Sequence, residues 1–268
     1  MPVLDLDAAL HVVPASSGEP GAFHADVPPG WKQGRGVYGG ATMGLLARTA
    51  TLFVARPERP MRALQGVIVA PVPDGPLELR ASTVREGSSV TTVDVTLGRA
   101  GETFARATAM FGKARRHEGR FAMDPPSIPA WEEVPIAPIG PPLGPEFAAN
   151  LEARNLGPIP FSGGPMEASG FVRTRTPTRA LGAPELCALV DTYWPAIFPA
   201  MPSLIPTSTL GFGAQIFPTI TPLSPAEPLY YRAKAEALAE GYLAELRELW
   251  TLGGELVVRN EQTFVVLG

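Results

Sequence analysis

Apolar residues occupy nearly every face of segment 41–54, where threonines and Arg48 are the only polar interruptions. This pattern is typical of a helix buried on most sides. Four segments with strand-like alternation follow, separated by Pro-Asp-Gly and Glu-Gly turns, and one of them is β-branched almost throughout. They span residues 62–70, 77–85, 90–97 and 103–111. We therefore predict one buried helix and then a four-strand antiparallel meander.

The second half of the chain repeats this order. Residues 101–106 read Gly-Glu-Thr-Phe-Ala-Arg and residues 254–259 read Gly-Glu-Leu-Val-Val-Arg, each after a Pro-Leu pair and a strand-like run broken by a glycine. The chain is therefore interpreted as a tandem duplication. A second helix is expected to begin at Pro184 and to end near Pro195 or Pro199. Strands are expected at 166–175, 208–217, 229–238, 242–250 and 255–267.

Two of these strands conflict with local propensity. Segments 233–240 and 243–249 consist of strong helix formers, which by themselves would favour a helical hairpin. The equivalent positions in the first half are β-branched, and charged residues alternate with alanines at the strand period. The repeat therefore favours strands here.

A proline-rich segment separates the two halves. Eight prolines between positions 125 and 145 rule out a regular helix or a central strand there. We predict a first unit at 1–123, a linker at 124–160 and a second unit at 161–268. Trp131 and Phe147 are expected to hold the linker against the surface.

Composition and charge exclude several functions. A net charge of −4 and a pI of about 5.5 argue against nucleic acid as a partner. The short basic run at 113–117 is either a solvated loop or a contact for an anionic group such as a nucleotide phosphate. Acidic residues near the start, and the lack of an apolar run of about 18 residues, predict a cytoplasmic protein without a membrane span.

Cysteine and histidine usage narrows the chemistry further. The single cysteine, Cys187, cannot form an internal disulfide and lies in an apolar stretch, so we expect it to be buried. His11, His24 and His117 are scattered outside both helices. We therefore expect no metal and no redox cofactor.

Particular residues give the chain a resemblance to a known family. They are Val37-Tyr38-Gly39-Gly40-Ala41, the run 84–90, the run 106–111, Asp191, Ser208-Thr209-Leu210 and Gln262. With them, about 31–111 and 186–266 resemble the double hot-dog acyl-CoA thioesterases, in particular the acyl-CoA thioesterase II family. The resemblance implies an α+β fold in which an antiparallel sheet wraps around two central helices. It also implies hydrolysis of acyl-CoA to free acid and CoA, and it allows a homo-oligomer formed through sheet edges.

The same resemblance implies three catalytic residues. In that family an acid, a hydroxyl and an amide hold the water that attacks the thioester, and the matching positions are Asp191, Thr209 and Gln262. Asp191 is also a lone acid in an apolar helix, although it could face solvent or cap the following residues. Gln262 stands where the first unit has Ala109, although it could point outward. Ser208 and Thr209 face opposite ways on a strand, so either could supply the hydroxyl.

The glycine turn is a candidate site for the thioester carbonyl. Backbone N–H groups of Tyr38, Gly39 and Gly40 at the start of the first helix could bind a developing oxyanion, or the glycines could serve close packing. Leu210-Gly211-Phe212 depart from the family, where an acidic residue and a histidine commonly follow the hydroxyl. The alternative is therefore a non-catalytic acyl-CoA-binding protein. A hydratase on the same fold is opposed by the few histidines.

Overall fold

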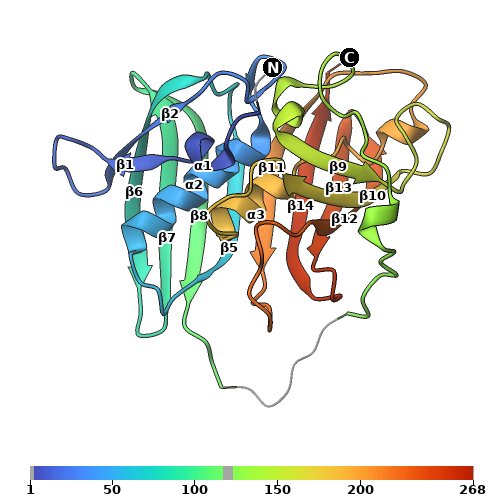
Figure 1. Ribbon diagram of the computed structural model, residues 1–268. Helices are drawn as coiled ribbons and strands as arrows, with labels where there is room; N and C mark the ends of the chain where they lie inside the picture. The colour runs from blue at the N-terminus through green and yellow to red at the C-terminus, as the bar shows by residue number, and fades with distance from the viewer. Residues whose placement is uncertain (1–2, 117–122, 268) are drawn as a thin grey trace.

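The computed structural model describes residues 3–116 and 123–267. Within them, a twelve-stranded antiparallel sheet has the two longer α-helices packed on one face (Figure 1), and a two-stranded hairpin forms a separate small sheet. The order across the sheet is β1-β2-β6-β7-β8-β5-β11-β14-β13-β12-β10-β9. The first unit forms one half of the sheet and the second unit the other. Each half of the sheet is accompanied by a helix. The predicted bounds of the two units stay a prediction.

The first unit differs from the expected meander in one connection. Its elements are α1 (Leu6–Ala9), β1 (Val12–Pro14), β2 (Ala22–Val27), β3 (Lys32–Gln33), β4 (Gly36–Val37), α2 (Gly39–Val54), β5 (Met61–Ile68), β6 (Gly75–Glu86), β7 (Val90–Arg99) and β8 (Glu102–Gly112). Strands β6, β7 and β8 pair in sequence, but β5 pairs with β8 and not with β6. The four-strand meander was therefore wrong at this connection. The outer side of β6 is taken by β2, which the sequence pattern did not reveal.

The second unit contains the two contested strands. Its elements are η1 (Trp131–Glu133), η2 (Glu146–Asn150), β9 (Leu151–Asn155), β10 (Glu167–Thr174), α3 (Ala183–Leu189), η3 (Phe198–Ala200), β11 (Thr207–Ile216), β12 (Leu229–Ala239), β13 (Tyr242–Trp250) and β14 (Leu256–Val266). Strands β12 and β13 pair along their length although their residues favour helix. Burial of one face in the shared core outweighs local propensity.

Helix α3 is shorter than expected. It ends at Leu189, so the prediction that it continues to Pro195 or Pro199 was wrong. The N–H groups of Asp191 and Thr192 bond to carbonyls three residues back, and the Thr192 hydroxyl donates to the Leu189 carbonyl at 2.8 Å. Pro195 also disfavours helical backbone at the residue before it. Asp191 therefore lies in the turn after the helix.

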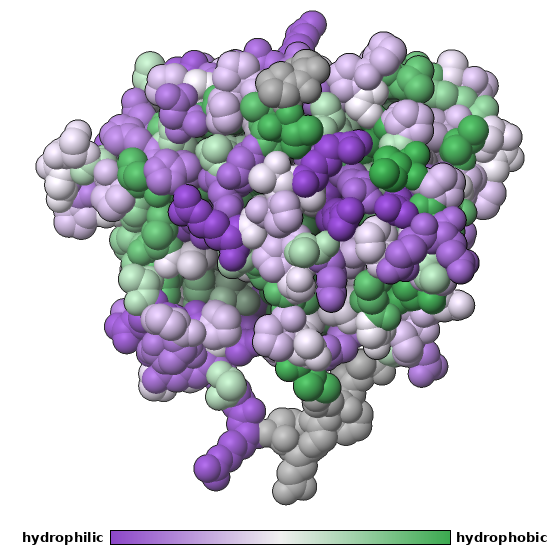
Figure 2. Space-filling model, in the orientation of Figure 1, coloured by the Kyte–Doolittle hydropathy of each residue, from purple (hydrophilic) through white to green (hydrophobic). Residues whose placement is uncertain are grey.

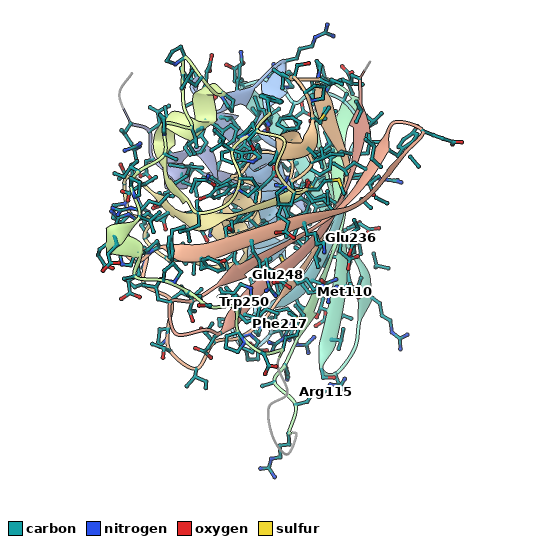
Figure 3. All side chains as sticks on the ribbon, turned by 90° about the vertical axis from the view of Figure 1, so that its right-hand side faces the viewer. Met110, Arg115, Phe217, Glu236, Glu248 and Trp250 are labelled. Carbon is teal, nitrogen blue, oxygen red and sulfur yellow. The ribbon has the colours of Figure 1, made fainter. Side chains whose placement is uncertain are left out.

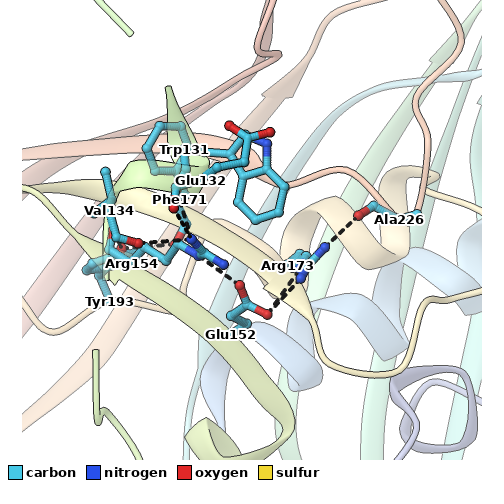
Figure 4. A network of polar contacts seen from close by, with 9 residues as sticks. All are labelled: Trp131, Glu132, Val134, Glu152, Arg154, Phe171, Arg173, Tyr193 and Ala226. Carbon is cyan, nitrogen blue, oxygen red and sulfur yellow. Dashed lines mark hydrogen bonds and ion pairs between the residues drawn. The ribbon is translucent and has the colours of Figure 1, made fainter. Parts of the chain in front are cut away.

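The proline-rich connector is bound to the second unit through an arginine–tryptophan cluster (Figure 4). The guanidinium groups of Arg154 and Arg173 lie 4.5 and 4.9 Å from the centre of the Trp131 ring. Glu152 joins the two arginines, and Arg154 Nη1 donates to the Trp131 and Val134 carbonyls at 3.0 and 2.9 Å. The expectation that Trp131 holds the segment in place is confirmed.

The same connector contributes an unexpected edge strand. Within the segment predicted as linker, β9 pairs with β10 at the end of the sheet. It forms there because no proline occurs between Pro145 and Pro158. The edge strands β1 and β9 are both short, which limits pairing with other chains. A homo-oligomer through these edges stays a prediction.

One hydrophobic core runs through both units. Strands β5 and β11 pair in the middle of the sheet and join the two halves. The buried apolar residues form one large cluster with members from both units. On the helical face, apolar side chains form separate patches among polar ones (Figure 2). Among the described helices, none has the length and apolar character needed to cross a bilayer.

Two glycines of α2 allow α2 and α3 to pack closely. A Cβ at Gly40 would lie 2.7 Å from the Ala188 carbonyl oxygen, and a Cβ at Gly44 would lie 2.9 Å from the Pro184 carbonyl oxygen. The two glycines are four residues apart, so they lie on the same face of α2. Cys187 is fully buried at this packing, as expected, and burial raises the pKa of its thiol to about 12.

Substitution at this contact tests the packing. Gly44→Ala should lower the free energy of unfolding by about 1–3 kcal/mol through overpacking, although alanine is the better helix former. Gly253→Ala is the matched control, because a Cβ there would meet nothing closer than 3.7 Å. Chemical denaturation measures both. Equal stability of the Gly44→Ala protein and the wild type would contradict the close helix contact.

Candidate active site

A cleft of about 630 Å³ lies where the two units meet. Its walls come from the β3–β4 hairpin, the start of α2, the end of β5, the turn after α3 and the start of β11. The volume is within the usual range of about 300–1,000 Å³ for small-molecule sites. Most of the wall is apolar, and its charged side chains are Arg35, Asp191 and Arg247.

Asp191 lies at the inner end of this cleft. The residue is 8% exposed, and its Oδ1 accepts hydrogen bonds from Arg247 Nη1 at 2.7 Å and Gln262 Nε2 at 2.8 Å. The Gly40 N–H also donates to the carboxylate. Asp191 is therefore not a solvent-facing residue, and its charge is partnered by donors from three different elements.

Gln262 is an inward residue of β14. It is 3% exposed and lies in a row with Asn260 and Phe264, so the outward orientation is excluded. One amide hydrogen goes to Asp191 and the other to Asn260 Oδ1 at 2.9 Å, while Gln262 Oε1 accepts from Thr209 Oγ1 at 3.2 Å. Both N–H groups of Gln262 are thus engaged, and the amide links Asp191 to Thr209.

A β-bulge decides which hydroxyl meets Gln262. The inward residues Phe212 and Ala214 would place Leu210 inward in a regular strand, but the register with β14 shifts between Thr209 and Gly211. Thr209 then lies opposite Phe264 and reaches Gln262. Ser208 lies opposite Val265 and lines the cleft without contacting the amide. Bulges commonly redirect a side chain beside an active site in this way.

Tyr38, Gly39 and Gly40 of the glycine turn differ in whether they reach the cleft. The Tyr38 ring is fully buried, stacks on Phe147 at 3.9 Å and donates its hydroxyl hydrogen to the Ala188 carbonyl. Gly40 supplies its N–H to Asp191. Only Gly39 lines the cleft, and a Cβ there would lie 2.9 Å from Asp191 Oδ2. The start of α2 therefore needs glycine in order to approach the carboxylate.

Sequence reasoning missed Arg247, which is buried next to Asp191. Arg247 Nε donates to Glu245 Oε1 at 2.8 Å, and both side chains point into the core from β13. The signal was available, because inward positions of this strand read Leu243, Glu245, Arg247 and Leu249. Two charges in an otherwise apolar inward row indicate a buried polar network.

The electrostatic setting of Asp191 combines two opposing effects. Burial raises the pKa of its carboxyl group, because the charged form loses hydration. Arg247, the Gln262 amide and the Gly40 N–H lower that pKa by stabilising the anion. Burial dominates, so the pKa of Asp191 is raised above its usual value. A carboxylate with a raised pKa is a stronger proton acceptor, as a general base requires.

The basic run at 113–116 is remote from the cleft. It follows β8 at the end of the sheet where Phe111 pairs with Met61, whereas the cleft lies at the Ile68 end of β5. Arg115 lies at this far end of the molecule in Figure 3. His117, the last residue of the run, lies outside the described residues. The described part of this run, residues 113–116, therefore does not line the cleft.

Other sequence expectations concern metal ligands. Within residues 3–116 and 123–267, no group of three or more histidine, cysteine or acidic side chains is placed to hold a metal ion. His11 and His24 are exposed on the first unit, and neither lines the cleft.

Solved structures similar to this one share its whole architecture. A conserved protein of unknown function with a hot dog fold from Alicyclobacillus acidocaldarius is 23% identical, with 98% of each chain covered and a TM-score of 0.84. The tesB protein of Mycobacterium avium subsp. paratuberculosis is 13% identical over 100% of each chain, with a TM-score of 0.79. An acyl-CoA thioesterase II, TesB2, of Mycobacterium marinum is 18% identical over 98% of each chain, with a TM-score of 0.77. The predicted double hot-dog fold is thus confirmed.

Family models identify both halves of the chain. No curated protein matches it. Residues 27–112 match the acyl-CoA thioesterase N-terminal domain, and residues 122–266 match the acyl-CoA thioesterase C-terminal domain. The two matches follow one another in order and cover most of the sequence. The chain therefore belongs to the acyl-CoA thioesterase family.

Proposed function

We propose that this protein hydrolyses acyl-CoA thioesters with a water molecule activated by Asp191, Thr209 and Gln262. The supporting observation is the continuous hydrogen-bonded chain from Asp191 through Gln262 to Thr209, which opens on a mostly apolar cleft. These side chains come from the turn after α3, from β14 and from β11. Asp191 and Thr209 line the cleft, and Gln262 joins them from behind the wall. This arrangement, together with membership of the thioesterase family, favours hydrolysis.

The hydrogen-bond pattern gives the three side chains different roles in the reaction. Thr209 donates its hydrogen to Gln262, so its oxygen can accept a hydrogen bond from the water. Asp191 accepts the water proton as the oxygen attacks the thioester carbonyl carbon. Gln262, whose N–H groups are both engaged, orients Asp191 and Thr209 rather than touching the water through a donor. This differs from the simple expectation that all three side chains contact the water.

The remaining steps use groups at the start of α2. The tetrahedral intermediate carries an oxyanion, and the Gly39 N–H, one of the first N–H groups of the helix, is the donor at the cleft. Collapse of the intermediate breaks the carbon–sulfur bond. The CoA sulfur leaves as a thiolate and receives the proton held by Asp191, which restores the carboxylate.

The cleft walls suggest how each part of the substrate is bound. Ile68, Pro206 and Phe264 are among the apolar residues that can contact the acyl chain. At the mouth, the β3–β4 hairpin presents Arg35, which is exposed and forms no ion pair with any described residue. Lys32 on the same hairpin is paired with Asp74 at 3.1 Å. Of the described cations that line the cleft, Arg35 is thus the one without an ion pair and is available to a phosphate of CoA.

Asp191→Asn tests the general base. Release of the CoA thiol from a medium-chain acyl-CoA should fall by at least about 100-fold, the lower range for loss of general base catalysis. Thermal melting should change by only a few degrees, because asparagine keeps the shape of the side chain. Unchanged turnover would remove the mechanism. Tight acyl-CoA binding by the wild type without thiol release would instead favour the non-catalytic acyl-CoA-binding alternative.

The bulge predicts different effects for the two neighbouring hydroxyls. Thr209→Val keeps the side-chain shape and removes the hydrogen bond to Gln262, so kcat should fall on the order of 100-fold through loss of orientation. Ser208→Ala is the matched control on the same wall and should leave kcat near the wild-type value. Steady-state thiol release measures both variants. A larger loss with Ser208→Ala would show that the hydroxyl role was assigned to the wrong residue.

If Arg35 binds a phosphate of CoA, its loss should weaken the binding of substrates that carry CoA but not of substrates without phosphate. Arg35→Ala should raise KM for acyl-CoA about 10-fold, equivalent to about 1.4 kcal/mol. It should leave KM for the acyl N-acetylcysteamine thioester, which has no phosphate, unchanged. Lys113→Ala at the far end of the sheet is the control. Equal KM increases for both substrates would contradict phosphate recognition by Arg35.

A further inference from the structure

Strand β13 carries a buried pair of opposite charges next to the proposed general base. The side chains of Glu245 and Arg247 are 0% and 1% exposed, and they are two residues apart on the inward face of the strand. Placing charges in a protein interior is costly unless each is paired and hydrogen-bonded. Apolar residues of similar volume would stabilise this position at least as well as a buried ion pair. We therefore ask what the pair does next to Asp191.

The pair forms a bridge from the sheet to the turn that carries Asp191. Arg247 donates through Nε to Glu245 Oε1 at 2.8 Å and through Nη1 to Asp191 Oδ1 at 2.7 Å. Glu245 Oε2 accepts the Ala196 N–H at 2.7 Å. Asp191 and Ala196 lie at the two ends of the same loop segment. Glu245 therefore fixes both the guanidinium and the far end of the loop.

The charges in this bridge do not balance. One guanidinium stands between two carboxylates, so the attraction that Arg247 exerts on Asp191 is shared with Glu245. The pKa of Glu245 is raised by its burial and also by Asp191, while Arg247 lowers it. The protonation of one carboxylate therefore depends on the other, with Arg247 between them.

Neutral but titratable groups complete the surroundings. Tyr38 from the start of α2, Tyr193 from the loop after α3 and Tyr231 from β12 are all buried around the bridge. Burial raises the pKa of all three phenols, so they stay protonated at neutral pH. Gln262 from β14 is the remaining polar partner. Among the described groups, the buried charges next to Asp191 are therefore those of Glu245 and Arg247, and Arg35 is exposed on the same cleft.

We propose that Glu245 and Arg247 are positioning residues that hold the Asp191 carboxylate in place for hydrolysis and control the charge that it experiences. This proposal rests on the proposed function, because it concerns the general base of that reaction. Arg247 fixes Oδ1, which leaves Oδ2, beside Gly39 at the cleft, for the water. Glu245 limits how strongly Arg247 stabilises the anion, so that Asp191 remains a competent proton acceptor.

The test compares the acid limbs of kcat/KM against pH in two single variants. Hydrolysis needs ionised Asp191, so kcat/KM falls as pH falls through the pKa of that group. Arg247→Gln removes the cation that lowers this pKa, and its acid limb should move to higher pH by about 1–3 units. Glu245→Gln removes the competing anion, and its acid limb should move to lower pH. The two displacements are opposite in sign, which a merely structural role would not produce.

A matched control is available on the same strand. Glu248 is also buried in β13, but it pairs with Arg232 and accepts from Trp250 Nε1 at 3.0 Å, away from Asp191. Figure 3 shows Glu248 and Trp250 near one another in this part of the sheet. Glu248→Gln should leave the acid limb where it is in the wild type. This separates the loss of any buried glutamate from the loss of the one joined to Arg247.

A further variant covers the case in which Arg247→Gln does not fold. Arg247→Lys keeps the positive charge and cannot bond to both carboxylates with the same geometry. It should lower kcat while leaving the acid limb in place, with folding verified by circular dichroism. The proposal would be overturned if Glu245→Gln and Arg247→Gln moved the acid limb in the same direction. It would also be overturned if the variants left both the acid limb and kcat unchanged. Absence of thiol release by the wild type would instead overturn the proposed function itself.

Discussion

The arrangement depends on one buried carboxylate and the donors that surround it. Asp191 loses hydration inside the protein, and Arg247, Gln262 and the Gly40 N–H replace water as its partners. Each donor comes from a different element, so the start of α2, β13 and β14 must all meet at one point. The close glycine contact between α2 and α3 makes this possible, because it brings the turn after α3 against the first residues of α2.

Duplication explains why the cleft lies between the units. Strands β5 and β11 pair at the centre of the sheet, and their adjoining ends both line the cleft. Asp191, Thr209 and Arg247 come from the second unit, whereas the first contributes Gly39 and Arg35 to the cleft. Gln262 occupies the position that corresponds to Ala109 in the first unit, so the two copies differ in sequence at this strand position. One unit therefore supplies the candidate base, and the other supplies backbone donors and the entrance.

Much of the fold could be predicted from period, turns and the internal repeat. The repeat correctly identified β12 and β13 as strands, although alanine, glutamate and leucine favour helix there. The pairing of β5 with β8 could not be read from the sequence, because strand order depends on long-range contacts. The end of α3 at Leu189 was also missed, since it depends on local bonds of Thr192 as well as on Pro195.

The candidate site was predictable in part. Asp191, Thr209 and Gln262 could be named from residue type and resemblance, whereas the bulge that turns Thr209 inward is a property of strand pairing. Arg247 escaped notice because its alternation with apolar residues is brief and lies in a helix-forming sequence.

The most direct test is a crystal structure with a non-hydrolysable thioether analogue of an acyl-CoA. The account predicts an ordered water between Asp191 Oδ2 and Thr209 Oγ1, with the acyl chain in the cleft and the reacting carbon beside the Gly39 N–H. An analogue bound away from Asp191, or a carboxylate turned from the cleft toward bulk water, would contradict it.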